Sequence, residues 1–131
     1  LRKLFPDSFI HFAATHRGAT LYIDRAQIEQ VLINLIKNAK ESCGQNTAPQ
    51  IEVELEQVPG KVCSLTVRDN GEGILPEVID KVFVPFFTTK PSGSGIGLSL
   101  CKQIMNLHGG TITVSSEIGK GSCFTLMFPG R

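Results

Sequence analysis

The residues best suited to chemistry are one aspartate and two clusters of glycine. The first cluster follows a strand-like segment as Asp69-Asn70-Gly71-Glu72-Gly73-Ile74, and the second opens a helix-like segment as Gly93-Ser94-Gly95-Ile96-Gly97-Leu98. Glycine lets backbone N–H groups approach an anion without a Cβ in the way, and a helix N-terminus adds unpaired donors. The second cluster therefore indicates a phosphate cradle. In isolation, each cluster is also compatible with a flexible surface turn.

Two asparagines, Asn34 and Asn38, lie four residues apart in a helix-like segment, so they stack on one face of that helix. They flank its apolar stripe, where exposed lysine or glutamate is more usual. A solvated surface pair and a functional pair are both compatible with this spacing.

An aromatic segment separates the two glycine clusters. Phe83, Phe86 and Phe87 would be core residues in most proteins. Between two glycine clusters they also fit a hinged lid that closes over a ligand. Lys90, which follows them, could contact a phosphate as a compact positive charge.

Composition excludes several classes of protein. The chain has 131 residues, 41% of them hydrophobic and 19% charged, and a net charge of +1. This is typical of one soluble domain and lacks the basic field that nucleic acid binding needs. No apolar run approaches a membrane span. The four cysteines form no CxxC pair, so we expect small buried hydrophobes in a reducing, cytoplasmic compartment.

The first half of the chain predicts short strands around one long helix. Strands are expected at 9–13 and 19–23, with Gly18 in the turn between them. Asp24 is a good N-cap for a helix over 25–43 that stops at Gly44. The helical spacing predicts a buried stripe of Ile28, Val31, Leu32, Leu35, Ile36 and Ala39.

The second half predicts a sheet with further helices. Strands are expected at 51–57, 62–68, 111–115 and 122–128, with a hairpin turn at Pro59-Gly60. A short helix is expected over 76–80 and a long one over 96–107, ended by Gly109-Gly110. The expected inner side of the long helix is Ile96, Leu100, Ile104 and Leu107. We therefore predict a two-layer α/β sandwich with a mixed, mainly antiparallel sheet packed on about three helices.

Four ordered motifs together resemble the ATP-binding catalytic domain of bacterial two-component sensor histidine kinases. They are the N box (34–39), the first glycine box (69–74), the F box (83–90) and the second glycine box (93–98). The superfamily also holds type II topoisomerases, mismatch-repair ATPases and a heat-shock chaperone, and its fold is the Bergerat-type sandwich with a mobile ATP lid. The resemblance covers residues 9–131, and 1–8 would be the end of a linker from an upstream dimerisation domain.

The resemblance implies ATP and Mg²⁺ as cofactors. Asp69 would accept a hydrogen bond from the adenine amino group, although a turn cap is the alternative role for it. Asn38 would bind Mg²⁺, with Asn34 nearby as a catalytic polar group and Lys90, Lys37 or Lys40 at the phosphates. The remaining nucleotide contacts would be Gly71, Gly73, Ile74, Phe83, Phe87, Thr88, Thr89, Gly93, Gly95, Ile96, Gly97 and Leu98.

The resemblance also bears on the reaction. Hydrolytic relatives carry a glutamate as general base where this chain has Asn34, which cannot accept a proton, so phosphoryl transfer is favoured over hydrolysis. His11, His16 and His108 lack the setting of a phosphoacceptor, which would lie on a separate dimerisation domain. The implied partners are that domain and a response regulator, with a monomeric fragment and a homodimeric full-length kinase. The alternatives are a serine kinase of the anti-sigma type and a nucleotide-binding scaffold.

Overall fold

The computed structural model describes residues 10–14, 24–44, 48–57, 63–87 and 97–129. Within those ranges the chain forms five strands and three helices. In chain order they are β1 (Ile10–Ala14), α1 (Arg25–Ser42), β2 (Ile51–Gln57), β3 (Cys63–Asp69), α2 (Pro76–Ile79), α3 (Gly97–Leu107), β4 (Thr111–Glu117) and β5 (Gly121–Phe128).

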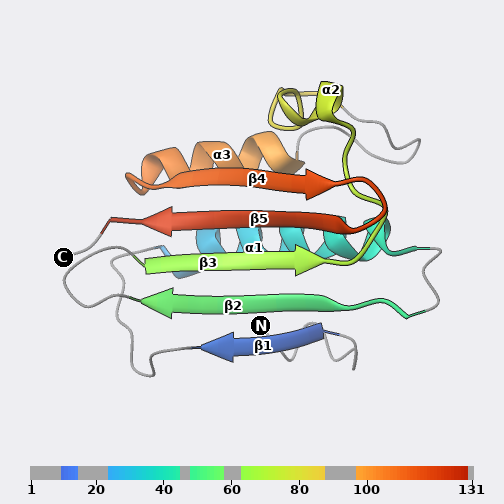
Figure 1. The fold of residues 1–131 in the computed structure, drawn as a ribbon. Helices are drawn as coiled ribbons and strands as arrows, with labels where there is room; N and C mark the ends of the chain where they lie inside the picture. The colour runs from blue at the N-terminus through green and yellow to red at the C-terminus, as the bar shows by residue number, and fades with distance from the viewer. Residues whose placement is uncertain (1–9, 15–23, 45–47, 58–62, 88–96, 130–131) are drawn as a thin grey trace.

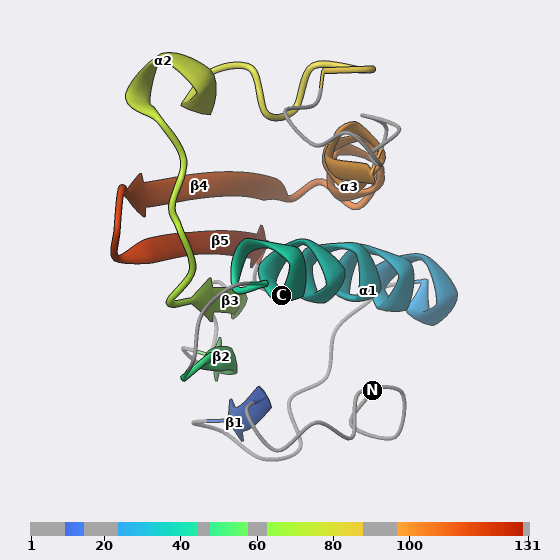
Figure 2. The ribbon, with the colours of Figure 1, turned by 90° about the vertical axis from the view of Figure 1, so that its right-hand side faces the viewer.

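The strands form one sheet in the order β1-β2-β3-β5-β4. β1 runs parallel to β2, and every other neighbouring pair is antiparallel. Helices α1 and α3 lie behind the sheet in Figure 1, and the side view of Figure 2 places both on the same side of it. α1 packs on β3, α3 packs on β4, and the short α2 contacts β4. The predicted two-layer α/β sandwich is confirmed.

Helix α1 is specified by its cap and its stripe. Asp24 has an extended backbone, and its Oδ1 accepts a hydrogen bond from the Gln27 backbone N–H at 3.1 Å, as the sequence predicts. The helix ends at Ser42, one residue before the predicted end, and Cys43 and Gly44 form the turn that follows. All six residues of the predicted stripe belong to the core. α1 therefore presents its apolar face to the sheet.

Strand alternation builds the other half of the core. On the face that α1 and α3 cover, apolar residues stand opposite one another in rows across the strands. One row is Val53, Val67, Phe124 and Val114, and the next is Leu55, Leu65, Leu126 and Ile112. Neighbouring side chains in such rows contact each other directly and fix the strand register.

The predicted inner side of α3 is partly wrong. Ile104 is buried, but Leu100 and Leu107 are 39% and 72% exposed, and the other buried residues are Cys101 and Met105. The stripe that faces α1 and β4 follows 101, 104 and 105. Cys101 lies where the two helices meet, with its Sγ 3.8 Å from the Val31 carbonyl oxygen. The small thiol suits this close contact better than a leucine would.

Most element ends fall within two residues of the expected ones. β3 includes Asp69, β4 continues to Glu117, and β5 begins at Gly121. α3 ends as predicted, because Gly109 has φ of +70° and the Gly110 N–H donates to the Met105 carbonyl oxygen at 2.9 Å. The predicted strand at 19–23, the turn at Pro59-Gly60 and residue Ile96 lie outside the described residues.

Candidate functional site

One row of the covered face is polar. At the carboxyl end of β3, Asp69 stands opposite Ser122 of β5, and Ser122 stands opposite Ser116 of β4. We call these three residues the polar row. Asp69 and Ser122 are each 5% exposed. A buried carboxylate is costly unless hydrogen bonds compensate for its lost hydration. The buried groups of the polar row therefore need hydrogen-bond partners.

Asp69 is held in place by its own turn. Its Oδ1 accepts a hydrogen bond from the Gly71 backbone N–H at 2.9 Å. The turn-cap role that was the alternative for Asp69 is thus present. A carboxylate has about four acceptor sites, so this bond and a donor on a ligand can share it. Asp69 is a pre-positioned hydrogen-bond acceptor at the end of a buried strand.

The first glycine box is clamped between α1 and the β4–β5 turn. A Cβ on Gly71 would overlap Ser42, and a Cβ on Gly73, whose φ is +82°, would overlap the Glu117 backbone. Between them, the Glu72 N–H donates to the Ser42 carbonyl oxygen at 3.2 Å, and the Glu72 carbonyl oxygen accepts from the Gly119 N–H at 3.0 Å. These glycines let the loop approach its own protein closely.

Asn34 joins α1 to the start of α3. Its Oδ1 accepts a hydrogen bond from Gln30 Nε2 at 3.0 Å, and its Nδ2 lies 3.4 Å from the Gly97 carbonyl oxygen and 3.8 Å from Cys101 Sγ. The structure therefore brings together two predicted site residues, Asn34 and Gly97. Gly97 begins α3, as expected for the end of the second glycine box.

Asn38 lies one turn further along α1 and is half-buried. It shares the covered side of the sheet with Asp69, because α1 packs on β3 and the end of α1 is bonded to the loop after Asp69. The Asp69 carboxylate also acts on Cys43, the residue that follows α1. Burial raises the pKa of the Cys43 thiol first, and the charge of Asp69 raises it further.

The F box leaves the core after its first residue. Phe83 packs on the core and makes an edge-to-face contact with Phe124, with ring centroids 6.2 Å apart. Lys102 Nζ lies 5.8 Å from the centroid of the Phe83 ring. Phe86 is 78% exposed and has φ of +67°, a strained backbone for a bulky residue. Phe87 is half-buried. The core interpretation therefore holds for Phe83 and is wrong for Phe86.

Two further predicted contacts, Ile74 and Leu98, also pack on the margin of the core. The predicted residues Thr88, Thr89, Lys90, Gly93, Gly95 and Ile96 lie outside the described residues.

Sequence reasoning missed Ser116 and Ser122. The signal was available, since alternation along 111–117 and 121–128 places both serines on the inner face, where apolar residues are the rule. An open hollow of about 340 Å³ lies at this end of the sheet and takes in residues of both of its faces. It is lined by Arg68, Asp69, Ser115, Ser116, Glu117, Lys120, Gly121, Ser122 and Cys123.

The kinds of side chain present show which metal site the domain could form. Among the described residues no three His, Cys, Asp or Glu side chains gather as a metal site. Mg²⁺ prefers oxygen ligands and is commonly held by one or two side chains together with phosphates. The Asn38 amide oxygen fits a site of that kind.

In the same part of the chain, no helix is both long and apolar enough to cross a membrane.

Comparisons with known proteins agree with this arrangement. Residues 23–131 match the family described as histidine kinase-, DNA gyrase B-, and HSP90-like ATPase. The chain is 38% identical over 120 residues to the sensor histidine kinase ZraS of Escherichia coli K12, covering 92% of this chain and 25% of ZraS. It is 45% identical over 93 residues to the C4-dicarboxylate transport sensor protein DctB of Rhizobium meliloti, covering 71% and 15%.

The fold comparison gives the same family. The nucleotide-free catalytic domain of the histidine kinase ThkA superposes with a TM-score of 0.81 at 35% identity, covering 92% of this chain and 78% of that one. Another ThkA structure holds that kinase in complex with the response regulator protein TrrA. This chain spans only about a quarter of the length of ZraS. In sequence and in fold, it belongs to the histidine kinase-, DNA gyrase B-, and HSP90-like ATPase family, and within it to the catalytic domains of sensor histidine kinases.

Proposed function

We propose that this domain binds Mg-ATP and transfers the γ-phosphoryl group to a histidine on a separate dimerisation domain, and that a response regulator is the next acceptor. The main observation that supports this proposal is the buried Asp69, which Gly71 holds on the side of the sheet that α1 covers. α1 also carries Asn34 and Asn38. The complex of ThkA with TrrA supports a response regulator as partner.

Asp69 would select the base. A carboxylate accepts a hydrogen bond from the amino group of adenine, whereas guanine would turn a carbonyl oxygen toward it. Asn38 would hold Mg²⁺ through its amide oxygen, and the bound ion would supply charge neutralisation at the phosphates. The start of α3 at Gly97 offers backbone N–H groups to the same anion.

Asn34 fits transfer to histidine. The step forms a phosphorus–nitrogen bond and breaks the bond from the γ-phosphorus to the bridging oxygen, which leaves on ADP. A neutral imidazole attacks through the nitrogen that carries a lone pair, so it needs no general base before attack, and the proton on its other ring nitrogen is released from the phosphorylated ring afterwards. Water does need a general base, and an asparagine amide cannot serve. Positioning and charge neutralisation then supply the catalysis.

The direct test mixes the purified domain with ATP and its histidine-bearing helical domain. We expect acid-labile phosphohistidine on the partner. An acid-stable product would indicate the serine kinase of the anti-sigma type. A domain that binds nucleotide and transfers nothing would indicate the scaffold.

Binding has its own test, calorimetry with a non-hydrolysable ATP analogue. We expect a Kd in the micromolar range or weaker that depends on Mg²⁺. Asp69→Asn should weaken binding by about 100-fold, because an amide N–H would then face the adenine amino group. Arg68→Gln, on the opposite face of the same strand, is the matched control and should bind like the parent. Equal affinity of Asp69→Asn and the parent would remove Asp69 from the base site.

Location and assembly complete the proposal. We place the domain in the cytoplasm, as free thiols suit a reducing compartment, and Cys43, Cys63, Cys101 and Cys123 are free in the described chain. We expect residues 1–8 to continue from a linker, and the domain to act within a homodimeric kinase.

A further inference from the structure

Ser116 has a hydroxyl whose bonds the proposed reaction does not explain. Its Oγ lies 2.7 Å from the Ile74 backbone nitrogen, 2.9 Å from the Gly121 carbonyl oxygen and 2.9 Å from Ser122 Oγ. A serine hydroxyl has one proton to donate and two lone pairs that accept. The three contacts therefore use its whole capacity.

The direction of each bond follows from the partners. The Ile74 N–H can only donate, so it occupies one lone pair of Ser116 Oγ. The Gly121 carbonyl oxygen can only accept, so it takes the Ser116 proton. Ser122 must then donate its own proton to the second lone pair of Ser116.

Ser122 is left without a proton for anything else. It stands opposite Asp69 in the strand register, and both are buried on the covered face. Each can therefore only accept hydrogen bonds from a group that approaches this end of the sheet, as long as Asp69 is ionised. Low exposure strengthens the effect, because a mismatched polar group there has little water to replace its lost partner.

We propose that Ser116 is a positioning residue for base selection: by taking the Ser122 proton, it makes the Asp69–Ser122 pair an acceptor-only edge. In direct contact, such an edge favours a 6-aminopurine nucleotide, whose amino group has two hydrogens to donate, and disfavours a purine whose carbonyl oxygen at position 6 can only accept. This inference rests on the proposed function, since it assumes that Asp69 contacts the base.

Removing Ser116 frees the proton. In Ser116→Ala the Ser122 hydroxyl can turn and donate to a 6-carbonyl or to Asp69. We expect the preference for ATP over ITP to fall by about 5- to 10-fold, because one acceptor on the edge becomes a donor. Ser115→Ala is the matched control, since Ser115 precedes Ser116 on β4 and lies exposed on the opposite face. It should keep the parent's preference.

A double-mutant cycle separates this role from simple structural support. Calorimetry with non-hydrolysable analogues of ATP and ITP gives the ratio of the two Kd values for each variant. Ser122→Ala removes the second acceptor and should also lower the preference for ATP. In the Ser122→Ala background, Ser116→Ala should change that ratio no further.

The outcomes are distinct. The inference is overturned if Ser116→Ala weakens the binding of ATP and ITP analogues equally. It is also overturned if Ser116→Ala changes the ratio of the two Kd values as much in the Ser122→Ala background as in the parent. Ser116 would then only support the Ile74 loop. If Ser116→Ala does not fold, Ser122→Ala alone decides, and an unchanged ratio there also overturns the inference. If the parent domain binds neither nucleotide, it is the proposed function that fails.

Discussion

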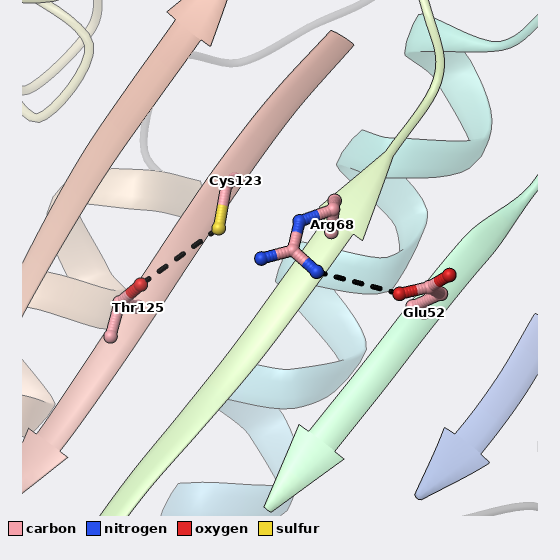
Figure 3. A network of polar contacts seen from close by, with 4 residues as sticks. All are labelled: Glu52, Arg68, Cys123 and Thr125. Carbon is pink, nitrogen blue, oxygen red and sulfur yellow. Dashed lines mark hydrogen bonds and ion pairs between the residues drawn. The ribbon is translucent and has the colours of Figure 1, made fainter.

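At the ends of β3 and β5, the two faces of the sheet carry polar residues in different surroundings. Arg68 stands opposite Cys123, and one residue later Asp69 stands opposite Ser122. Figure 3 shows the open face, where Arg68 reaches Glu52 at 3.4 Å and Cys123 Sγ lies 3.9 Å from Thr125 Oγ1. Asp69 and Ser122 face the helices. Their side-chain contacts are 2.9 Å long.

Burial accounts for this difference. The Arg68 and Glu52 side chains are 55% and 53% exposed, so water can replace either partner, and such pairs contribute about 0–1 kcal/mol. On the covered face water cannot substitute as easily, so the number and direction of hydrogen bonds become strict. Polar residues on the open face keep the sheet soluble, whereas those on the covered face can recognise a ligand.

The largest expected effect is a difference in stability between variants of two neighbouring residues on β5. Phe124 is 1% exposed and packs against Phe83, whereas Thr125 points to the open face. Phe124→Ala should lower the free energy of unfolding by about 3–5 kcal/mol, because it removes a large buried ring and leaves a cavity. Thr125→Ala should change it by less than about 0.5 kcal/mol. Urea denaturation of the two variants measures both, and similar losses would show that the open face is as tightly packed as the core.

An intermediate effect concerns two cysteines. Burial raises the pKa of Cys101 from 9.0 to about 11. The unfolded chain therefore ionises first, and the stability held by the protonated thiol is fully present below about pH 9 and lost as pH rises toward 11. The loss should be roughly 2–3 kcal/mol.

Denaturation at about pH 8 and about pH 11 measures this loss. Cys101→Ala should show a smaller loss than the parent, whereas Cys123→Ala, which changes a half-buried thiol on the open face, should lose as much as the parent. The same pH dependence in Cys101→Ala and the parent would contradict the assignment.

The smallest expected effect is at the surface ion pair. Glu52→Gln should lower the free energy of unfolding by less than about 1 kcal/mol, and added salt should reduce the difference, because both charges are exposed. Arg68→Gln should lower the free energy of unfolding by a similarly small amount. A loss above about 2 kcal/mol in low salt would contradict this expectation, because only a buried ion pair should cost that much to break.

Much of the fold followed from local patterns. Asp24, the stripe of α1 and the alternation of β2 each depend on one short segment and its own periodicity, and the structure confirms them. Leu100 and Leu107 were placed wrongly, because the buried side of α3 is set by where α1 and β4 lie and not by hydrophobicity alone.

The residues of the candidate site also divide into those that a local pattern predicts and those that depend on how the chain folds. Asp69, Gly71 and Gly73 were predicted, since a motif within one segment carries them. Ser116 and Ser122 were missed, because their meaning arises only when β4 and β5 pair and bring two hydroxyls beside a carboxylate from β3. A serine at an inward position looks like a weak core residue until its cross-strand partner is known.

Glu72 joins the end of α1 to the β4–β5 turn through main-chain atoms alone, while its side chain is exposed. Saturation mutagenesis should therefore find an uneven tolerance along three consecutive codons. Position 72 should accept almost any amino acid except proline, which lacks the N–H that reaches Ser42. Positions 71 and 73 should accept glycine alone, because a single added carbon collides with Ser42 or with Glu117.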